Sequence, residues 1–424
     1  MKKLIFIALI LVVLLSLTGC AGGKTVELPL NGFHGFENGL IIEVDESNFL
    51  VQENKTVENA YVFEDGKLLK LKAKESKFIL NPEISNVAEE TTLEIKYYVH
   101  NDTVYCYQKT DYRQQGITFE FFTIPNDSEN VLISGTVMKK PMILNVKSGE
   151  LKVLFDEVDV CRLVGLSLPL ISEDGKYVVV LCGTKYEAAR NELNDYYVIN
   201  LKTSEAKQLP KIIIEQNREP MPNDNEAYYK HSTTPYAFVG DEILLTYTMK
   251  HDKDESLNMS EAYYYNLENE ETREWDKEID FSEYTDGYPG HHILMQKDIS
   301  SGECYLYNIK TNKEFYYKPG VSTEIYGTPN QSGRFILGGL KEWPTHNNGS
   351  VDNTIEAYVT HALIDMEKGE IVDIAKYVKD FTFTEYKGKT VINMQWIGET
   401  NLLVVYGNEQ ERYTDIIDLS AAIQ

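Results

Sequence analysis

A strand–turn–strand unit recurs along this chain and constrains its fold more than any other feature. The clearest copy is Tyr196–Pro210, in which a strand pattern (Tyr196–Leu201) leads through a polar turn (Lys202–Glu205) into a second strand (Ala206–Leu209). Aromatic and β-branched residues favour the strands, and the polar cluster favours the turn. Related units begin at Pro141, Tyr263, Cys304 and Thr360, and a degenerate copy begins at Asp415.

An Asn or Asp follows the apolar strand of every copy and sets the period. These residues are Asn145, Asn200, Asn266, Asn308, Asp365 and Asp418, at spacings of 55, 66, 42, 57 and 53 residues. Several short strands within a period of this length are typical of a β-propeller, whereas a helical solenoid would show helical periodicity. The sequence therefore predicts an all-β propeller.

A second repeated element, a polar turn before an almost wholly apolar strand, carries a family resemblance. Its best copy is Ser172–Leu181 (SEDGKYVVVL), and weaker copies begin at Val239, Gln331 and Ile397. Together with the Asn-Leu-Lys-Thr turn that follows, it resembles the WD40-like propeller repeat of Tol-Pal-type periplasmic proteins. The propeller domain of prolyl oligopeptidase and dipeptidyl peptidase IV relatives has a similar unit. The weaker copies lack the Asp or the Gly, and the Gly-His and Trp-Asp signatures of WD40 proper are absent. The resemblance covers roughly residues 140–420 and implies an architecture, not an activity.

The repeat count predicts seven blades, closed by an N-terminal strand. The final unit lacks an outer strand, and an open edge invites aggregation, so we expect the early strand Gly39–Asp45 to complete it. An eighth blade hidden in the blurred first third is the alternative. The predicted blades lie near residues 49–112, 119–155, 160–209, 235–276, 288–317, 330–375 and 391–419 plus 39–45.

The first 20 residues resemble a bacterial lipoprotein signal. Lys2 and Lys3 precede an apolar run, and Leu17-Thr18-Gly19-Cys20 follows it. The resemblance implies removal of residues 1–19 and attachment of acyl chains, such as palmitate, at Cys20, which would anchor the protein to the extracytoplasmic face of a membrane. An ordinary secretory peptide or a transmembrane helix is the alternative. We expect residues 20–38 to form a tether and residues 39–424 to form the propeller.

Charge and cysteine content limit the partners. Removing residues 1–19 takes away two lysines and no acid, so the net charge of −25 becomes −27. This acidity disfavours nucleic acid as a partner. The remaining cysteines (Cys106, Cys161, Cys182 and Cys304) form no CxxC pair, which leaves zinc unsupported. Cys161 and Cys182 are the pair in which a disulfide would be tested first.

No established catalytic motif is intact. Neither GxSxG nor HExxH occurs, which argues against transfer of peptidase activity from the resemblance. The stretch His251–Ser256 gathers oxygen ligands, and calcium is the one cofactor it would suit, although a solvated turn is the ordinary interpretation. His291 and His292 start a strand pattern and are candidate ligand-binding residues near the central channel. Packed histidines are the alternative, because neighbours on a strand face opposite ways.

Long loops on a rigid scaffold often carry binding residues. The loop Lys341–Thr354 contains Trp343 and His346 and is the preferred contact candidate. We expect a non-catalytic scaffold or sensor that binds a protein, peptide or envelope glycan. The alternative is an envelope hydrolase or lyase whose site is assembled at the channel from several blades. A structural accessory with a permanent partner is a third hypothesis.

Overall fold

The computed structural model describes part of the chain between residues 30 and 420. The described ranges are 30–31, 34–37, 39–44, 57–85, 87–108, 119–135, 140–164, 169–184, 187–188, 195–211, 229–251, 259–275, 286–288, 293–298, 303–317, 322–330, 332–343, 358–372, 374, 377–382, 384–408 and 411–420.

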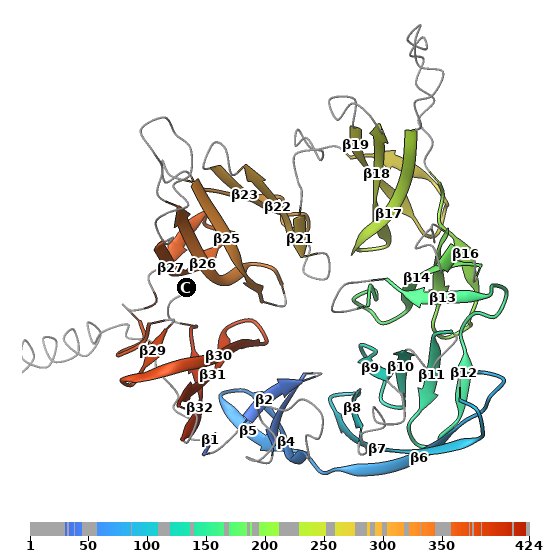
Figure 1. Ribbon diagram of the computed structural model, residues 1–424, viewed down its shortest axis with the longest axis horizontal. Coiled ribbons are helices and arrows are strands. Elements are labelled where there is room, and N and C mark those ends of the chain that lie inside the picture. Colours follow the sequence, from blue (N-terminus) through green and yellow to red (C-terminus); the bar gives the residue numbers. More distant parts are fainter. Residues whose placement is uncertain are drawn as a thin grey trace, which may run out of the picture.

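The described residues form antiparallel sheets that follow one another around a ring, so the predicted all-β propeller is confirmed (Figure 1). Seven of the sheets have four or five strands. Their strands are β1 (Leu30–Asn31) with β29 (Glu385–Tyr386), β30 (Lys389–Ile397), β31 (Asn401–Gly407) and β32 (Arg412–Asp418); β2 (His34–Glu37), β3 (Leu40–Val44), β4 (Val57–Glu64) and β5 (Lys67–Lys70); β9 (Phe119–Thr123), β10 (Asn130–Gly135), β11 (Met142–Asn145) and β12 (Leu151–Val153); β13 (Val160–Leu163), β14 (Tyr177–Gly183), β15 (Asp195–Asn200) and β16 (Ala206–Gln208); β17 (Tyr229–Val239), β18 (Glu242–His251), β19 (Met259–Asn266) and β20 (Thr272–Glu274); β21 (Asp286–Tyr288), β22 (Ile293–Asp298), β23 (Glu303–Asn308) and β24 (Lys313–Tyr317); and β25 (Ser322–Pro329), β26 (Phe335–Trp343), β27 (Tyr358–Asp365) and β28 (Glu370–Val372).

One further described sheet has three strands: β6 (Lys74–Leu80), β7 (Thr91–His100) and β8 (Thr103–Gln108). The prediction of one blade over residues 49–112 is therefore wrong, because this stretch holds the end of one sheet and the whole of the next. Seven blades were predicted, and seven sheets have four or five strands. The three-stranded sheet β6–β8 is the extra unit that the alternative placed in the first third of the chain.

The sheet β6–β8 also runs in the opposite sense to its neighbours. The next sheet adds its strands outward, from β9 near the middle of the ring to β12, whereas β6 lies at the outer edge and β8 lies further in (Figure 1). β8 contacts β9 and β10, and a Cβ on Gly149, in the outer turn of the next sheet, would meet the Lys77 carbonyl of β6. This reversal explains why the repeat is blurred before residue 141.

An N-terminal strand closes the ring, but it is not the predicted one. β1 pairs with β32, placing Leu30 opposite Thr414. β3, within the predicted closing stretch Gly39–Asp45, pairs instead with β2 and β4. Leu40, Ile41 and Ile42 are buried, and such an apolar run suits a central strand covered on both faces rather than an edge. β1 and β2 also fall within residues 20–38, the stretch predicted as a tether.

The repeated Asn and Asp residues shape one recurring turn. The Asn200 side-chain oxygen accepts hydrogen bonds from the backbone N–H groups of Lys202 (3.0 Å) and Thr203 (3.1 Å). The Ser204 N–H donates to the Asn200 carbonyl at 2.7 Å, and Ser204 has a positive φ of 61°. Asn and Asp suit this position because their short side chains satisfy turn N–H groups. The same capping recurs at Asn145, Asn266, Asn308 and Asp365, each followed four residues later by a positive φ.

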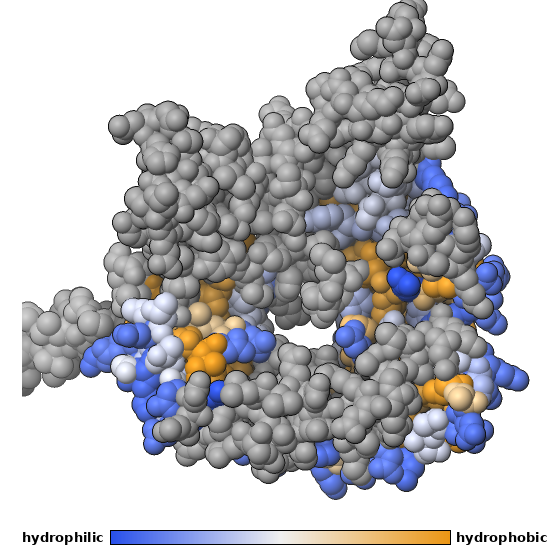
Figure 2. Space-filling model, in the orientation of Figure 1, coloured by the Kyte–Doolittle hydropathy of each residue, from blue (hydrophilic) through white to orange (hydrophobic). Residues whose placement is uncertain are grey.

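The core lies between neighbouring sheets. Val178 and Val180 of β14 pack toward the preceding sheet with Leu132 of β10, and Val179 packs toward the following sheet with Leu245 of β18. Apolar residues therefore cover both faces of the inner strands, as the sequence predicts. Figure 2 shows an opening near the middle of the ring, with hydrophilic residues over much of the described rim. Within the part of the chain described here, no helix has the length and apolar character needed to cross a membrane.

Candidate functional site

The strand registers divide the connections between two faces of the ring. Asn200 lies opposite Tyr177, so the Asn200 turn and the loop before β14 share one face. We call the face that carries the Asn and Asp turns the Asx-turn face. β14, β18 and β26 end on the other face, which we call the opposite face.

Of the predicted ligand-binding residues, Trp343 is the one whose position the structure describes. Trp343 is the last residue of β26, opposite Ser322, and therefore stands at the opposite face. His291 and His292 lie outside the described residues, in the connection that precedes Ile293. His346, Cys20 and the candidate calcium stretch after His251 also lie outside the described residues.

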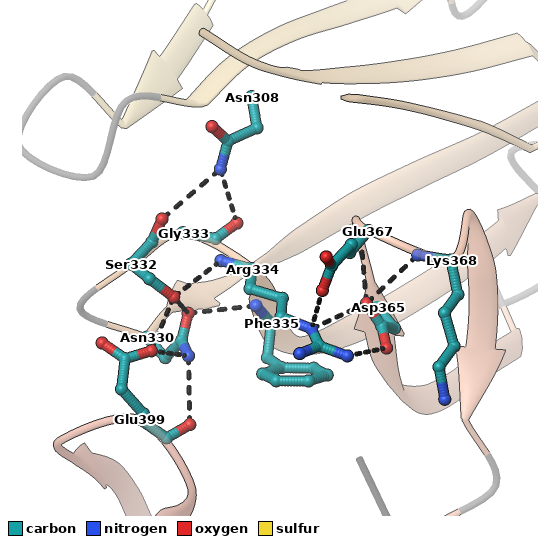
Figure 3. Close-up of polar contacts among 10 residues, drawn as sticks. All are labelled: Asn308, Asn330, Ser332, Gly333, Arg334, Phe335, Asp365, Glu367, Lys368 and Glu399. Carbon is teal, nitrogen blue, oxygen red and sulfur yellow. Dashed lines mark hydrogen bonds and ion pairs between the residues drawn. The ribbon is translucent and has the colours of Figure 1, made fainter. Parts of the chain in front are cut away.

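A polar cluster on the Asx-turn face joins three sheets (Figure 3). The Asn308 amide of the β23–β24 turn donates to the carbonyls of Gly333 (3.1 Å) and Ser332 (3.4 Å) in the β25–β26 loop. From that loop, the Asn330 amide donates to the Glu399 carboxylate of the β30–β31 turn at 2.7 Å, and the Ser332 hydroxyl donates to the same carboxylate at 2.5 Å. The cluster therefore links the β23–β24 turn of one sheet to the β25–β26 loop of the next and the β30–β31 turn of the third.

Arg334 and Asp365 form the charged half of this cluster. The Asp365 carboxylate is 0% exposed and accepts from the Arg334 guanidinium at 3.3 and 3.2 Å. The hydrogen bond to Asp365 raises the pKa of Arg334, and the guanidinium also lies 4.7 Å from the centre of the Phe335 ring. Asp365 further caps its own turn through the N–H groups of Glu367 and Lys368. The polar groups in this cluster thus act on one another and stabilise the ring.

A groove of about 500 Å³ also opens on the Asx-turn face, between the sheets β9–β12 and β13–β16. Asp127 and Asp174 line it beside three lysines (Lys152, Lys176 and Lys202). The Ser172 hydroxyl donates to Asp174 at 2.7 Å and holds the pKa of that carboxyl below its usual value. Asp127 caps the Glu129 and Asn130 N–H groups. Both carboxylates are therefore engaged in shaping their own loops.

The opposite face carries a lysine–carboxylate–phenol cluster in the last sheet. The Lys387 ammonium lies 2.8 Å from an Asp415 carboxylate oxygen, and the Tyr406 hydroxyl donates to the same oxygen at 3.1 Å. Asp415 is buried, while Lys387 lines an open pocket of about 500 Å³ with Asp380, Thr382, Glu385 and Gly388. The Lys387–Gly388 turn adjoins Gly407, the end of β31 remote from the Asx-turn face.

Burial, followed by the Asp415 charge, raises the pKa of Tyr406 to about 12. The phenol therefore stays protonated near neutral pH and serves as a hydrogen-bond donor rather than a base. The cluster as a whole offers a cation and hydrogen-bonding groups at the edge of a pocket. Within the described residues, no group of three His, Cys, Asp or Glu side chains is arranged to hold a metal ion.

Sequence reasoning missed this cluster, although a signal was present. Asp415 directly precedes the apolar pair Ile416-Ile417 within the predicted strand Tyr413–Leu419, and a carboxylate buried in a strand demands a partner. Its partner Lys387 lies 28 residues earlier in the chain, in a tight hairpin turn. The spacing between them follows no repeat, so only the folded ring brings the two together.

The chain was compared with protein-family models, curated proteins and solved structures. No family model and no curated protein matches the sequence. Among solved structures, the chain is similar to a putative TolB from Agrobacterium tumefaciens, with 9% identity, a TM-score of 0.32, and coverage of 82% of this chain and 98% of that one. A TolB from Acinetobacter baumannii matches at 13% identity, a TM-score of 0.22 and coverage of 81% and 79%. Prolyl oligopeptidase B from Galerina marginata matches at 10% identity and a TM-score of 0.36, over 91% of this chain and 55% of that one. Identities and TM-scores this low carry no argument about what this chain does.

Proposed function

We propose that this propeller is a binding scaffold or sensor that recognises a protein, peptide or envelope glycan through its opposite face. The difference between the two faces carries the proposal. On the Asx-turn face, the polar cluster and both carboxylates of the groove are engaged in shaping their own loops. On the opposite face, the Lys387 ammonium lines an open pocket while its partner Asp415 is buried.

The chemistry of the opposite face suits recognition of polar groups. Lys387 supplies a cation held in place by Asp415, and Asp380 and Glu385 supply acidic groups around the same pocket. β26 ends at Trp343 on the same face, in the sheet that packs against the last one. A rigid ring presents such groups with little loss of conformational freedom on binding.

Anchoring is part of the proposal. The signal-like residues 1–19 and Cys20 support a lipid anchor that holds the ring at the extracytoplasmic face of a membrane. The net charge of −25 supports an interaction with protein, peptide or glycan rather than with nucleic acid.

The test is crosslinking in intact cells followed by recovery of the full-length protein. Glu385 is exposed and lines the pocket on the opposite face, while Glu205 is exposed in the β15–β16 turn on the Asx-turn face. Glu385→Arg and Glu205→Arg therefore make the same charge change on opposite sides of the ring. Cys20→Ala tests the anchor.

We expect a specific envelope component that is recovered with wild type and with Glu205→Arg, but is lost with Glu385→Arg and reduced with Cys20→Ala. Equal recovery with the two Arg variants would overturn the assignment of the face. If the purified ring instead hydrolyses or cleaves envelope peptides or glycans, the enzymatic alternative replaces the scaffold.

A further inference from the structure

Two cysteines face each other across the innermost strand pair of one sheet. Cys161 of β13 and Cys182 of β14 are directly opposite in the register. Their sulfur atoms are 2.8 Å apart, and both residues are buried. They are 21 residues apart in the chain and are free thiols in the structure.

The register places this pair where a cross-strand disulfide fits. The Val164 N–H donates to the Val179 carbonyl directly opposite, so that position is a hydrogen-bonded one. Hydrogen-bonded and non-hydrogen-bonded positions alternate along an antiparallel pair. Cys161 and Cys182, three positions along, therefore occupy a non-hydrogen-bonded position, where facing side chains approach most closely. The Cα separation of about 4.5 Å at such positions lies within the range that disulfides span.

We propose that Cys161 and Cys182 are a redox-active dithiol that closes to a disulfide joining β13 to β14. A small-molecule disulfide is the oxidant. The thiolate of one cysteine attacks it, forming a mixed disulfide and releasing one thiol. The second cysteine then attacks the mixed disulfide, forming the Cys161–Cys182 bond and releasing the second thiol. The cysteines lose two electrons and two protons, and the small disulfide is reduced to two thiols.

The position of β13 gives the bond a structural consequence. β13 has four residues and is the first strand of its sheet, hydrogen-bonded to a neighbour on one side only. Short edge strands open more readily than central ones. Such opening exposes the pair to the oxidant, and the disulfide then fixes β13 to the sheet. Oxidation thereby stiffens the inner edge of one blade.

The chemistry of the reduced pair sets the rate of closure. The Cys182 thiol donates to the Cys161 sulfur, and this hydrogen bond together with burial raises the pKa of Cys161. Because the thiolate is the nucleophile, we expect closure to be slow at neutral pH and faster in alkaline buffer.

The test counts thiols by mass spectrometry in the full-length protein. Reduced protein is treated with oxidised glutathione, either folded or while refolding from urea, so that burial cannot withhold the oxidant. It is then denatured and alkylated. We expect two fewer alkyl groups after oxidation and a linked peptide pair containing Cys161 and Cys182. Cys106→Ser is the control and should retain this loss of two, because Cys106 is a buried cysteine of another sheet.

Cys161→Ser and Cys182→Ser should each abolish the link. Full alkylation of wild type in both treatments would overturn the proposal. Mixed disulfides with glutathione that persist in wild type without a Cys161–Cys182 link would overturn it as well.

Discussion

Gly175 provides the sharpest test of how the blades are held together. It belongs to the Ser172–Lys176 turn and has a positive φ of 70°. A Cβ placed there would lie 2.1 Å from the Pro125 carbonyl oxygen of the preceding sheet. Gly66 has nearly the same φ, 71°, yet a Cβ on it meets nothing within 4 Å. Gly175→Ala and Gly66→Ala therefore share the backbone penalty and differ in contact between blades.

The two costs can be separated. A non-glycine residue in the left-handed region costs about 1–2 kcal/mol, and this is the whole expected loss for Gly66→Ala. Forcing an extra carbon into a packed contact costs a further 1–3 kcal/mol, roughly. Because the atom that Gly175→Ala meets is a backbone carbonyl, a side-chain rotation cannot relieve the clash. We expect Gly175→Ala to lose about 2–5 kcal/mol of stability.

Urea unfolding followed by circular dichroism measures both variants against wild type. The difference between them reports the contact between the β9–β10 and β13–β14 loops. If the two substitutions destabilise the protein equally, the close approach of Gly175 to Pro125 does not hold the blades together, and the reasoning fails.

Four further predictions concern single polar groups. Asp365→Ala should cost about 2–4 kcal/mol in urea unfolding, because it removes two turn hydrogen bonds and a buried partner of a half-exposed arginine, whereas Asp365→Asn should cost less than half as much. Asn308→Asp should destabilise the protein at neutral pH, and this loss of stability relative to wild type should shrink as pH falls toward about 4, where an ordinary carboxyl becomes protonated. Urea unfolding at several pH values measures the difference. The pKa of Tyr406 is raised from 10.0 to about 12 in the folded protein, so the stability that this shift contributes is complete below pH 10 and is lost as pH rises through 12. Urea unfolding across this interval should therefore show a smaller loss of stability for Tyr406→Phe than for wild type. Ser172→Ala should raise the pKa of Asp174 toward its ordinary value, measured by NMR titration, because it removes the hydrogen bond that lowers it.

The propeller could be predicted because most blades contain a hairpin whose sequence pattern is local and recurs along the chain. An apolar strand, an Asn or Asp and a polar turn are local features, and Asn200 illustrates that the turn is formed by residues within five positions of one another. Burial on both faces was also readable, since the run Val178–Val180 leaves no polar face.

The order of strands could not be read in the same way. Periodicity reports how a strand is buried, not which neighbour it pairs with. The sequence therefore predicted one blade where β4 and β5 belong to one sheet and β6–β8 form the next. The closing strand β1 has two residues, too few to show a pattern. The contacts between blades are also invisible in sequence: Lys310 pairs with Glu173 across 137 positions. The Lys387–Asp415 pair lies within one sheet, but its spacing of 28 residues likewise follows no repeat.

The choice between Asn and Asp at the repeated turn position follows from the group that the second side-chain atom meets. Both side chains can cap the turn through one oxygen, so the turn itself does not discriminate. The second atom of Asn308 faces the carbonyls of Ser332 and Gly333, and only an amide can donate to them. The second oxygen of Asp365 faces the Arg334 guanidinium, and a carboxylate is the better acceptor there. A carboxylate at the Asn308 position would set negative charge against two carbonyl oxygens in a site that is 0% exposed. The blades of this ring thus share the turn and differ in the group that its second side-chain atom contacts, which belongs to the next sheet at Asn308 and to the same sheet at Asp365.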